Sequence, residues 1–323
     1  MDLRTKVIDK IKDKNTRSIG IVMHNKPDGD SIGSALALEI ALKKIGKKVV
    51  DVIIHDKINS RFAPFVGEKR VNRKNYPPEG RKYDLLIMVD FSDPNRTMEG
   101  IRRISKFIIV IDHHILNKPY GDIYLCEKVA STGIIIYELI KRLTNINSEI
   151  ANAIYLTLRS DTDGFTNSNT DDKAHKIASE LLQKGANVDL VNSVYESKSA
   201  QYVKLMGSTL SEVKIDKKYK IAYLVVTRDK IKNSGILDEE VPLLINEFRY
   251  INDIDISFLF IEGITNVRVC GRSRQSSVNK VLEKFGGGGH PKASGCAFKD
   301  MYILDVVNDV LDFTIECIDK KII

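Results

Sequence analysis

The first half of the chain alternates short aliphatic runs with segments in which apolar residues recur at helical spacing. The aliphatic runs predict buried strands at residues 19–23, 49–54, 85–89 and 107–111. Helical spacing predicts helices at residues 31–45, 131–143, 148–159 and 171–184, after a short amphipathic helix that carries Leu3, Val7, Ile8 and Ile11. This alternation is typical of a parallel sheet covered by helices.

The pattern changes in the second half. Residues 187–213 are helical and more polar, which indicates a connector. Strand-like runs return at residues 219–226, 254–261 and 266–271, and helices are predicted at 276–285 and 301–318. We therefore expect an α/β protein, with a parallel-sheet domain at residues 1–186, a helical linker at 187–215 and a smaller α/β domain at 216–323.

Composition narrows the class of protein only slightly. The 323 residues are 43% hydrophobic, which is enough to build the cores of two domains. The net charge of +7 suits a polyanionic substrate, but the charges are scattered, so a solvated lysine-rich surface explains them equally well. The four cysteines form no CxxC pair, which argues against a zinc ribbon. No apolar run approaches the ~18 residues that cross a bilayer, and the charged N-terminus is unlike a signal peptide, so we expect a cytoplasmic protein.

Acidic and histidine residues directly follow three of the predicted strands. These residues are His24, Asp28 and Asp30 after the first strand, Asp90 after the third, and Asp112, His113 and His114 after the fourth. In an open parallel sheet, ligands bind beyond the carboxyl ends of the strands. We therefore expect these carboxylates and imidazoles to line one edge of the sheet.

The segment Asp28-Gly29-Asp30 has two interpretations. If it is extended, both carboxylates point the same way and each can reach one of two metal ions. The alternative is an Asp-Gly turn in which Asp28 caps the next helix. Pro27 prevents the strand from turning directly into that helix, and Gly29 allows a tight backbone path.

The adjacent histidines are the more specific signal. Two histidines straight after a buried strand rarely serve packing, and neighbouring side chains point in different directions, so one can bind metal while the other faces substrate. Asp161 follows a predicted helix and by itself is an ordinary loop acid. A ligand set of carboxylates and imidazoles without cysteine suits Mn²⁺, Co²⁺ or Fe²⁺. Two such ions about 3.5 to 4 Å apart are the usual apparatus of phosphoryl displacement.

A glycine run in the second half is a candidate anion site. Gly286 to Gly289 precede His290, and Arg272-Ser273 lies a short way upstream. Four glycines are also compatible with a flexible linker. The ordered pattern on both sides favours a loop whose N–H groups wrap an anion, with Arg272 and His290 donating further hydrogen bonds.

Taken together, these motifs resemble the DHH phosphoesterases that carry a DHH-associated C-terminal domain. The matching residues, in the family's order, are His24, Pro27, Asp28, Gly29, Asp30, Asp90, Asp112, His113, His114, Asp161, Gly286 to Gly289 and His290. The segments 90–96, 272–273 and 278–280 resemble the branch of nanoRNases and pAp phosphatases. Asp163 departs from the pattern, because many members have glycine there.

The resemblance implies a role for each of these residues. One metal ion would bind His24, Asp28 and Asp90, and a second would bind Asp30, Asp90, His113 and Asp161. Asp112 would orient the site, and His114 would contact the scissile phosphate, so Asp90, Asp112 and His114 are the expected catalytic residues. The expected substrate-binding residues are Arg96, Arg272, Ser273, Gly286, Gly287, Gly288, Gly289 and His290. The expected ions are two Mn²⁺, with Mg²⁺ or Co²⁺ as alternatives, and the family leads us to expect a homodimer.

The activity that the resemblance implies is hydrolysis of short oligoribonucleotides, and of 3′-phosphoadenosine 5′-phosphate (pAp) to AMP. Alternatives are a phosphodiesterase for linear pApA from the cyclic di-AMP pathway, a manganese pyrophosphatase, and a non-catalytic nucleotide sensor. A pyrophosphatase lacks the GGGGH loop, and a sensor is favoured only where metal ligands are lost. Metal ligands in one domain and a phosphate loop in the other lead us to expect a short substrate held between the two domains.

Overall fold

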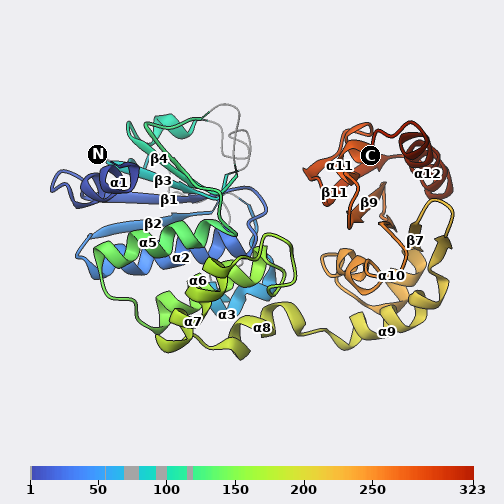
Figure 1. The fold of residues 1–323 in the computed structure, drawn as a ribbon, viewed down its shortest axis with the longest axis horizontal. Helices are drawn as coiled ribbons and strands as arrows, with labels where there is room; N and C mark the ends of the chain where they lie inside the picture. The colour runs from blue at the N-terminus through green and yellow to red at the C-terminus, as the bar shows by residue number, and fades with distance from the viewer. Residues whose placement is uncertain (1, 55, 69–79, 92–99, 115–118) are drawn as a thin grey trace. The chain divides into compact units, whose positions relative to one another are not determined.

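The chain folds into two compact units, Met1–Ser197 and Lys198–Ile323, in the computed structural model (Figure 1). The structure describes residues 2–54, 56–68, 80–91, 100–114 and 119–323. Arg96, one of the expected substrate-binding residues, lies outside these ranges. Among the described residues, no helix combines the length and the apolar character needed to cross a membrane.

Unit 1 is built on a five-stranded sheet in the order β2-β1-β3-β4-β5, and every neighbouring pair is parallel. The strands are β1 (Ser18–Met23), β2 (Val49–Ile53), β3 (Leu85–Val89), β4 (Ile108–Asp112) and β5 (Ile123–Cys126). The four strands predicted from aliphatic runs are confirmed. The fifth, β5, was not predicted, because its sequence IYLC is short and only partly buried.

Helices cover the sheet and bury the main apolar core of unit 1. They are α1 (Leu3–Lys12), α2 (Gly29–Lys44), α3 (Ala63–Val66), α5 (Thr132–Leu143), α6 (Ser148–Asp161), α7 (Asp172–Gln183) and α8 (Val188–Glu196). Figure 1 shows α2, α5 and α6 on the same face of the sheet. Their aliphatic side chains and those of β1, β3 and β4 form one buried cluster. The four predicted helices and the short N-terminal helix are confirmed.

The start of α2 settles the two interpretations of Asp28-Gly29-Asp30. Asp28 is extended and caps the helix, because its carboxylate accepts hydrogen bonds from the backbone N–H groups of Asp30 and Ser31, each at 3.1 Å. Gly29 and Asp30 already belong to α2. Of the two interpretations, the capping turn is therefore confirmed and the extended segment is wrong, because capping satisfies N–H groups that the first turn of a helix leaves without partners.

Unit 2 contains a mixed six-stranded sheet in the order β10-β11-β9-β8-β7-β6. The strands are β6 (Lys214–Asp216), β7 (Ile221–Val226), β8 (Ile256–Glu262), β9 (Asn266–Ser273), β10 (Gly288–His290) and β11 (Ala293–Lys299). Only β7 and β8 pair in parallel. The helices are α9 (Ala200–Thr209), α10 (Arg228–Ser234), α11 (Val278–Glu283) and α12 (Ile303–Asp319), and two apolar clusters flank the sheet.

The predicted α/β class is confirmed for both units. Strands β6, β10 and β11 were not predicted, and β10 consists of two glycines and a histidine that lack the β-branched side chains typical of strands. Within the segment 187–215, Val191 and Val194 of α8 join the core of unit 1, whereas Tyr202 and Leu205 of α9 join a core of unit 2. The helical segment therefore contributes packing to each unit.

Close packing of α2 on α6 generates a stability prediction. A Cβ at Gly33 would overlap the Ala153 carbonyl oxygen and lie 2.6 Å from Thr157 Cγ2. Gly33→Ala would force the helices apart, so we expect a loss of about 1–3 kcal/mol in the free energy of unfolding, measured by urea denaturation. Gly207→Ala in α9 is the control, because nothing lies within 4 Å of its Cβ position. We expect the control to match or exceed wild-type stability by up to ~1 kcal/mol, and a wild-type transition in Gly33→Ala would contradict the close approach.

Candidate metal centre

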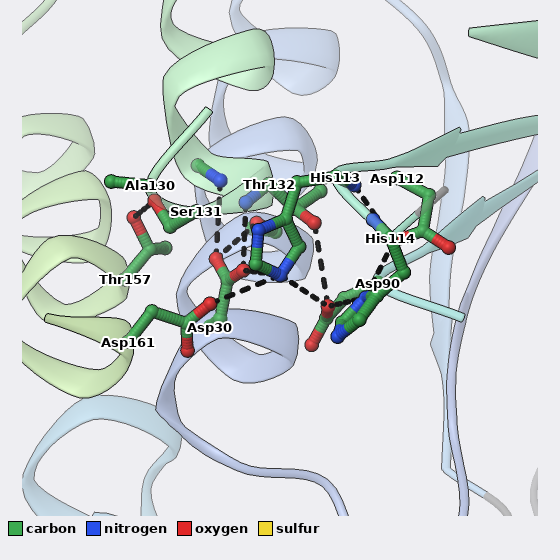
Figure 2. A network of polar contacts seen from close by, with 12 residues as sticks. Asp30, Asp90, Asp112, His113, His114, Ala130, Ser131, Thr132, Thr157 and Asp161 are labelled. Atoms are coloured by element: carbon green, nitrogen blue, oxygen red, sulfur yellow. Dashed lines mark hydrogen bonds and ion pairs between the residues drawn. The ribbon is translucent and has the colours of Figure 1, made fainter. Parts of the chain in front are cut away.

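The ends of three strands and one helix bring the expected metal-binding residues of unit 1 together. His24 follows β1, Asp90 follows β3, and His113 follows β4. Asp161 is the last residue of α6 rather than a loop residue beyond it. Three groups have ligand atoms within 4.8 Å of one another: His24 with Asp28 and Asp90, Asp30 with His113 and Asp161, and Asp90 with His113 and His114. Figure 2 shows the carboxylates around the His113 ring.

Asp90 lies at the centre of this group. Its carboxylate is 3.5 Å from His24 Nε2, 3.8 Å from His113 Nε2 and 3.5 Å from His114 Nδ1. The side chain is 3% exposed, and the backbone φ of 62° lies in the left-handed region. A non-glycine residue there is strained, and such strain concentrates at functional sites. The chain therefore holds Asp90 in an unfavourable conformation that directs it toward three imidazoles.

The N-terminus of α5 holds Asp30. Thr132 N donates to Asp30 Oδ2 at 2.7 Å (Figure 2). Gly133 N donates to Asp30 Oδ1 at 3.1 Å. Helix N-termini favour anions through their free N–H groups and the helix dipole. This contact lets Asp30 be fully buried. Thr132 and Gly133 were not among the predicted site residues, although Ser131-Thr132-Gly133 at a predicted helix start is a recognisable signal.

The His113 ring presents one nitrogen to the carboxylates. Its Nδ1 donates to the Val129 carbonyl oxygen at 3.1 Å, which leaves the lone pair of the neutral ring on Nε2. That atom lies 3.2 Å from Asp161 Oδ2 and 3.9 Å from Asp30 Oδ2. It is buried and has no hydrogen-bond partner among the described residues. Among buried groups, an acceptor turned toward other acceptors is an arrangement that a metal ion would stabilise.

His24 follows the same arrangement. Its Nδ1 lies 2.7 Å from the Asn25 carbonyl oxygen, and its Nε2 faces Asp90 and, at 3.9 Å, Asp28. The ring is 3% exposed. Both imidazoles therefore use Nδ1 to fix their orientation on the backbone and direct Nε2 at carboxylates, as metal-binding histidines do.

Asp112 orients the second histidine of the pair. One carboxylate oxygen accepts from His113 N at 2.7 Å, His114 N at 3.0 Å and His114 Nδ1 at 2.9 Å. The two rings contact each other edge to face with centroids 4.2 Å apart, yet they present different atoms to Asp90, Nε2 of His113 and Nδ1 of His114. The buried Asp112 carboxylate binds the backbone N–H groups of both histidines and keeps the two rings in contact.

The carboxylates of this centre perturb one another. Burial and the charge of Asp90 raise the pKa of Asp30 well above its usual value, and burial with the charge of Asp30 does the same for the pKa of Asp161. Burial opposes ionisation of Asp90 too, but its hydrogen bond with His24 and the nearby His113 and His114 lower its pKa. Burial and His114 lower the pKa of His113, which favours the neutral ring.

Gly29 is needed here for close approach rather than for backbone freedom. Its φ is not positive, but a Cβ would overlap the Tyr195 hydroxyl and lie 2.9 Å from the Ser160 side chain. The reason expected from the sequence, a tight backbone path, is therefore replaced by a steric one. Tyr195 of α8 and Ser160 of α6 confine the turn between Asp28 and Asp30.

In unit 2, the register of the sheet relates Arg272 to His290. His290 of β10 lies opposite Ala293 of β11, and Ala293 lies opposite Arg272 of β9. Residues directly opposite in antiparallel pairs project from the same face. Arg272 and His290 therefore flank the small Ala293 side chain on one face of the sheet, and Ser273 follows Arg272 at the end of β9.

The glycine run is part of this sheet and not a flexible linker. Gly288 and Gly289 pair with Gly295 and Ser294 of β11. A Cβ at Gly287 would lie 2.5 Å from the Gly295 carbonyl oxygen, and Gly289 has a φ of 143° that only glycine adopts readily. Close packing and backbone conformation thus require glycine at these positions.

The sequence of each unit matches a known domain. Residues 18–158 match the DHH family, N-terminal domain, and residues 216–320 match the DHHA1 domain. The chain belongs to the DHH family. The resemblance on which the sequence analysis relied is confirmed, and the matched segments contain all of the expected site residues except Asp161.

Relatives of this DHH chain cover nearly its whole length. The bifunctional oligoribonuclease and PAP phosphatase NrnA of Thermus thermophilus is 29% identical over 297 residues, which are 91% of this chain and 88% of that protein. An exopolyphosphatase-related protein from Bacteroides fragilis has a similar structure, with a TM-score of 0.89, 26% identity and coverage of 98% and 96%. RecJ of Thermus thermophilus in complex with Mn²⁺ shares the fold, with a TM-score of 0.57, 15% identity and coverage of 97% and 55%. The chain is a phosphoesterase of this family.

The donor set of the DHH enzyme fits divalent metal ions. It offers four carboxylates and the Nε2 atoms of His24 and His113, two rings that backbone carbonyls orient through Nδ1. Of these two atoms, His113 Nε2 has no hydrogen-bond partner in the described part of the chain. Divalent ions bound here would offset the repulsion among the carboxylates and supply Lewis acidity toward a phosphate ester.

The repulsion predicts an opposite effect of one substitution on stability and on metal binding. Asp161→Asn removes a carboxylate whose pKa is raised in the folded chain. A raised pKa means that protonation of Asp161 stabilises the folded chain. This stabilisation is complete below the unfolded pKa of about 3.9 and is lost as pH rises through the folded pKa. In chelator, we therefore expect the variant to melt roughly 2–4 °C above wild type at about pH 8, with a smaller gap at about pH 4.

The same melting experiment with Mn²⁺ tests the other half of the prediction. Mn²⁺ should raise the melting temperature of wild type more than that of Asp161→Asn, because ligand binding stabilises only a chain that binds it. Asp163→Asn is the matched control, since Asp163 lies two residues away and pairs with Arg159 at 3.7 Å. An equal Mn²⁺ effect on Asp161→Asn and wild type would remove Asp161 from the metal centre.

Proposed function

We propose that this DHH enzyme hydrolyses short oligoribonucleotides to nucleoside 5′-monophosphates and pAp to AMP, using two divalent ions. The observation that carries the proposal is the cluster of carboxylates around the His113 Nε2 atom, which has no hydrogen-bond partner among the described residues. The substrate class is supported by the Thermus thermophilus relative, which is named as an oligoribonuclease and PAP phosphatase. A sensor without catalysis is disfavoured, because the six expected metal-binding residues are present and lie together.

We assign one ion to His24, Asp28 and Asp90, whose ligand atoms lie within 4.8 Å of one another. The second ion is assigned to Asp30, His113 and Asp161, which form an equally close group, with Asp90 shared. Imidazole together with carboxylate favours Mn²⁺ over Mg²⁺, which prefers oxygen ligands. A structure of RecJ, which shares the fold, contains Mn²⁺.

His114 and Asp112 are proposed to act on the phosphate and not on the ions. Burial lowers the pKa of His114, but its hydrogen bond with Asp112 and the charge of Asp90 outweigh burial and raise it. A cationic ring held by Asp112 at 2.9 Å stabilises negative charge on a phosphate oxygen. Water attacks phosphorus, the bond to the leaving oxygen breaks, and that oxygen takes up a proton.

Recognition of the nucleotide is assigned to Arg272, Ser273, the glycine strand and His290. An arginine binds a phosphate through two parallel hydrogen bonds, and a histidine N–H adds a third donor. Both side chains project from one face of the unit 2 sheet. We further propose a cytoplasmic homodimer, which light scattering would test.

Substrate length tests the proposed activity most simply. Initial rates with Mn²⁺ should be highest for pAp and for RNA of roughly two to five nucleotides, and should fall steeply toward a strand of about 24, because long strands need extended stacking grooves of about 4–16 nucleotides per module. The rates are compared at one salt concentration, since electrostatic affinity depends on salt. A flat profile, or faster cleavage of the long strand, would contradict the proposal.

Separate roles for the two units predict a split between substrates. Arg272→Ala and His290→Ala should each lower kcat/KM for pAp by roughly 10- to 100-fold, the scale of one charged hydrogen bond. Hydrolysis of bis-p-nitrophenyl phosphate, which has no nucleotide to recognise, should change much less. Arg274→Ala is the control, because the interaction known for Arg274 uses its backbone N–H. Equal losses on both substrates would place Arg272 and His290 in the chemical step or in folding.

A further inference from the structure

A turn held by one carboxylate directly follows Arg272 and Ser273. The Asp255 carboxylate, just before β8, accepts hydrogen bonds from three successive backbone N–H groups, those of Arg274 at 3.0 Å, Gln275 at 2.6 Å and Ser276 at 3.1 Å. It also accepts from Ser276 Oγ at 2.5 Å. One carboxylate thus fixes the whole turn that ends β9.

The turn also binds Lys292, which lies between β10 and β11. The Lys292 ammonium donates to the carbonyl oxygens of Gln275 and, at 3.4 Å, of Ser276. At the other end of the residue, Ser273 N donates to the Lys292 carbonyl oxygen at 3.0 Å. Ser273 Oγ completes the turn by donating to the Ser276 carbonyl oxygen at 2.6 Å. Lys292 is therefore attached to the turn through both its side chain and its backbone.

Lys292 determines which ring nitrogen of His290 carries the proton. The Lys292 N–H donates to His290 Nδ1 at 3.3 Å. A ring nitrogen that accepts a hydrogen bond carries no proton, so in the neutral ring the proton resides on Nε2. His290 thereby presents an N–H donor, which is the form that binds a phosphate oxygen.

One continuous path of hydrogen bonds therefore runs from Asp255 through the turn and Lys292 to His290. The same turn adjoins Arg272, which lies across Ala293 from His290 in the register of the sheet. Burial raises the pKa of Asp255, but its hydrogen bonds from Ser276 and the turn N–H groups outweigh burial and lower it. The carboxylate is therefore ionised at neutral pH and accepts all four hydrogen bonds.

We propose that Asp255 is a positioning residue that places Arg272 and His290 for the phosphate of the nucleotide, acting through the turn 274–276 and Lys292. The inference rests on the proposed function, which assigns nucleotide recognition to Arg272 and His290. A turn that served only stability would affect every substrate alike. A turn that positions the two phosphate donors affects nucleotide binding and leaves the metal centre of unit 1 intact.

Asp255→Asn tests the proposal in the full chain with Mn²⁺. The amide keeps one oxygen for the turn, so the fold should persist, but its NH₂ group faces the donors of Ser276. We expect KM for pAp to rise about 10-fold and kcat to stay within about 3-fold. The dissociation constant for AMP, measured by calorimetry, should rise by a similar factor, and turnover of bis-p-nitrophenyl phosphate should not change.

Two further variants sharpen the result. Lys292→Met keeps the length of the side chain but removes its hydrogen bonds to the turn, so it should raise KM in the same way. Asp253→Asn makes the same change in charge two residues from Asp255, at an exposed position, and should behave as wild type.

The outcomes separate this inference from the proposed function. If Arg272→Ala loses pAp binding while Asp255→Asn keeps the wild-type KM and AMP affinity, the positioning role is wrong and the proposed function stands. Equal losses of Asp255→Asn on pAp and on bis-p-nitrophenyl phosphate would also overturn the positioning role, because they indicate general loss of structure. A wild-type KM in Arg272→Ala would overturn the proposed nucleotide site and the inference with it.

Discussion

Repulsion among buried carboxylates is the constraint on which the rest of unit 1 depends. Asp30, Asp90 and Asp161 approach one another where water is largely excluded, and burying unpaired charge costs several kcal/mol per ion in real proteins. The fold offsets part of this cost with N–H groups of α5 on Asp30 and imidazoles around Asp90. The remaining unbalanced charge, together with the His113 Nε2 atom, is what fits the centre to divalent cations.

Rigid elements hold these groups in place against their repulsion. Each expected metal-binding residue of unit 1 lies at the end of a strand or helix whose interior is buried, so its backbone has little freedom to move away. Asp28 has two contacts, because its carboxylate both caps α2 and faces His24. Unit 2 shows a similar arrangement, since the Asp255 carboxylate accepts hydrogen bonds from three successive backbone N–H groups. Both units thus use backbone N–H groups to hold carboxylates where they are needed.

The sequence was most informative where chemistry follows directly from a buried strand. His24, Asp90 and His113 stand at the ends of aliphatic runs, and parallel pairing was enough to predict that they meet. Contacts between distant segments could not be predicted from the sequence. The hydrogen bonds of Thr132 with Asp30 and of Lys292 with the turn at 274–276 depend on tertiary packing that no local pattern encodes. The glycine strand β10 was missed for another reason. Its conformation is imposed by pairing with β11 and not by the propensity of its residues. The helix start at Gly29 was left undecided, because Asp-Gly suits both an extended segment and a cap.

The central claim is that one cluster of carboxylates and imidazoles binds two divalent ions and that hydrolysis depends on them. The most direct measurement counts Mn²⁺ per chain by elemental analysis after dialysis, together with kcat for pAp, in wild type and in Asp90→Asn. We expect two ions in wild type, fewer in the variant, and a loss of at least ~10³-fold in kcat while the circular dichroism spectrum is unchanged. Undiminished turnover by a chain shown to contain no metal, or wild-type turnover by Asp90→Asn, would contradict it.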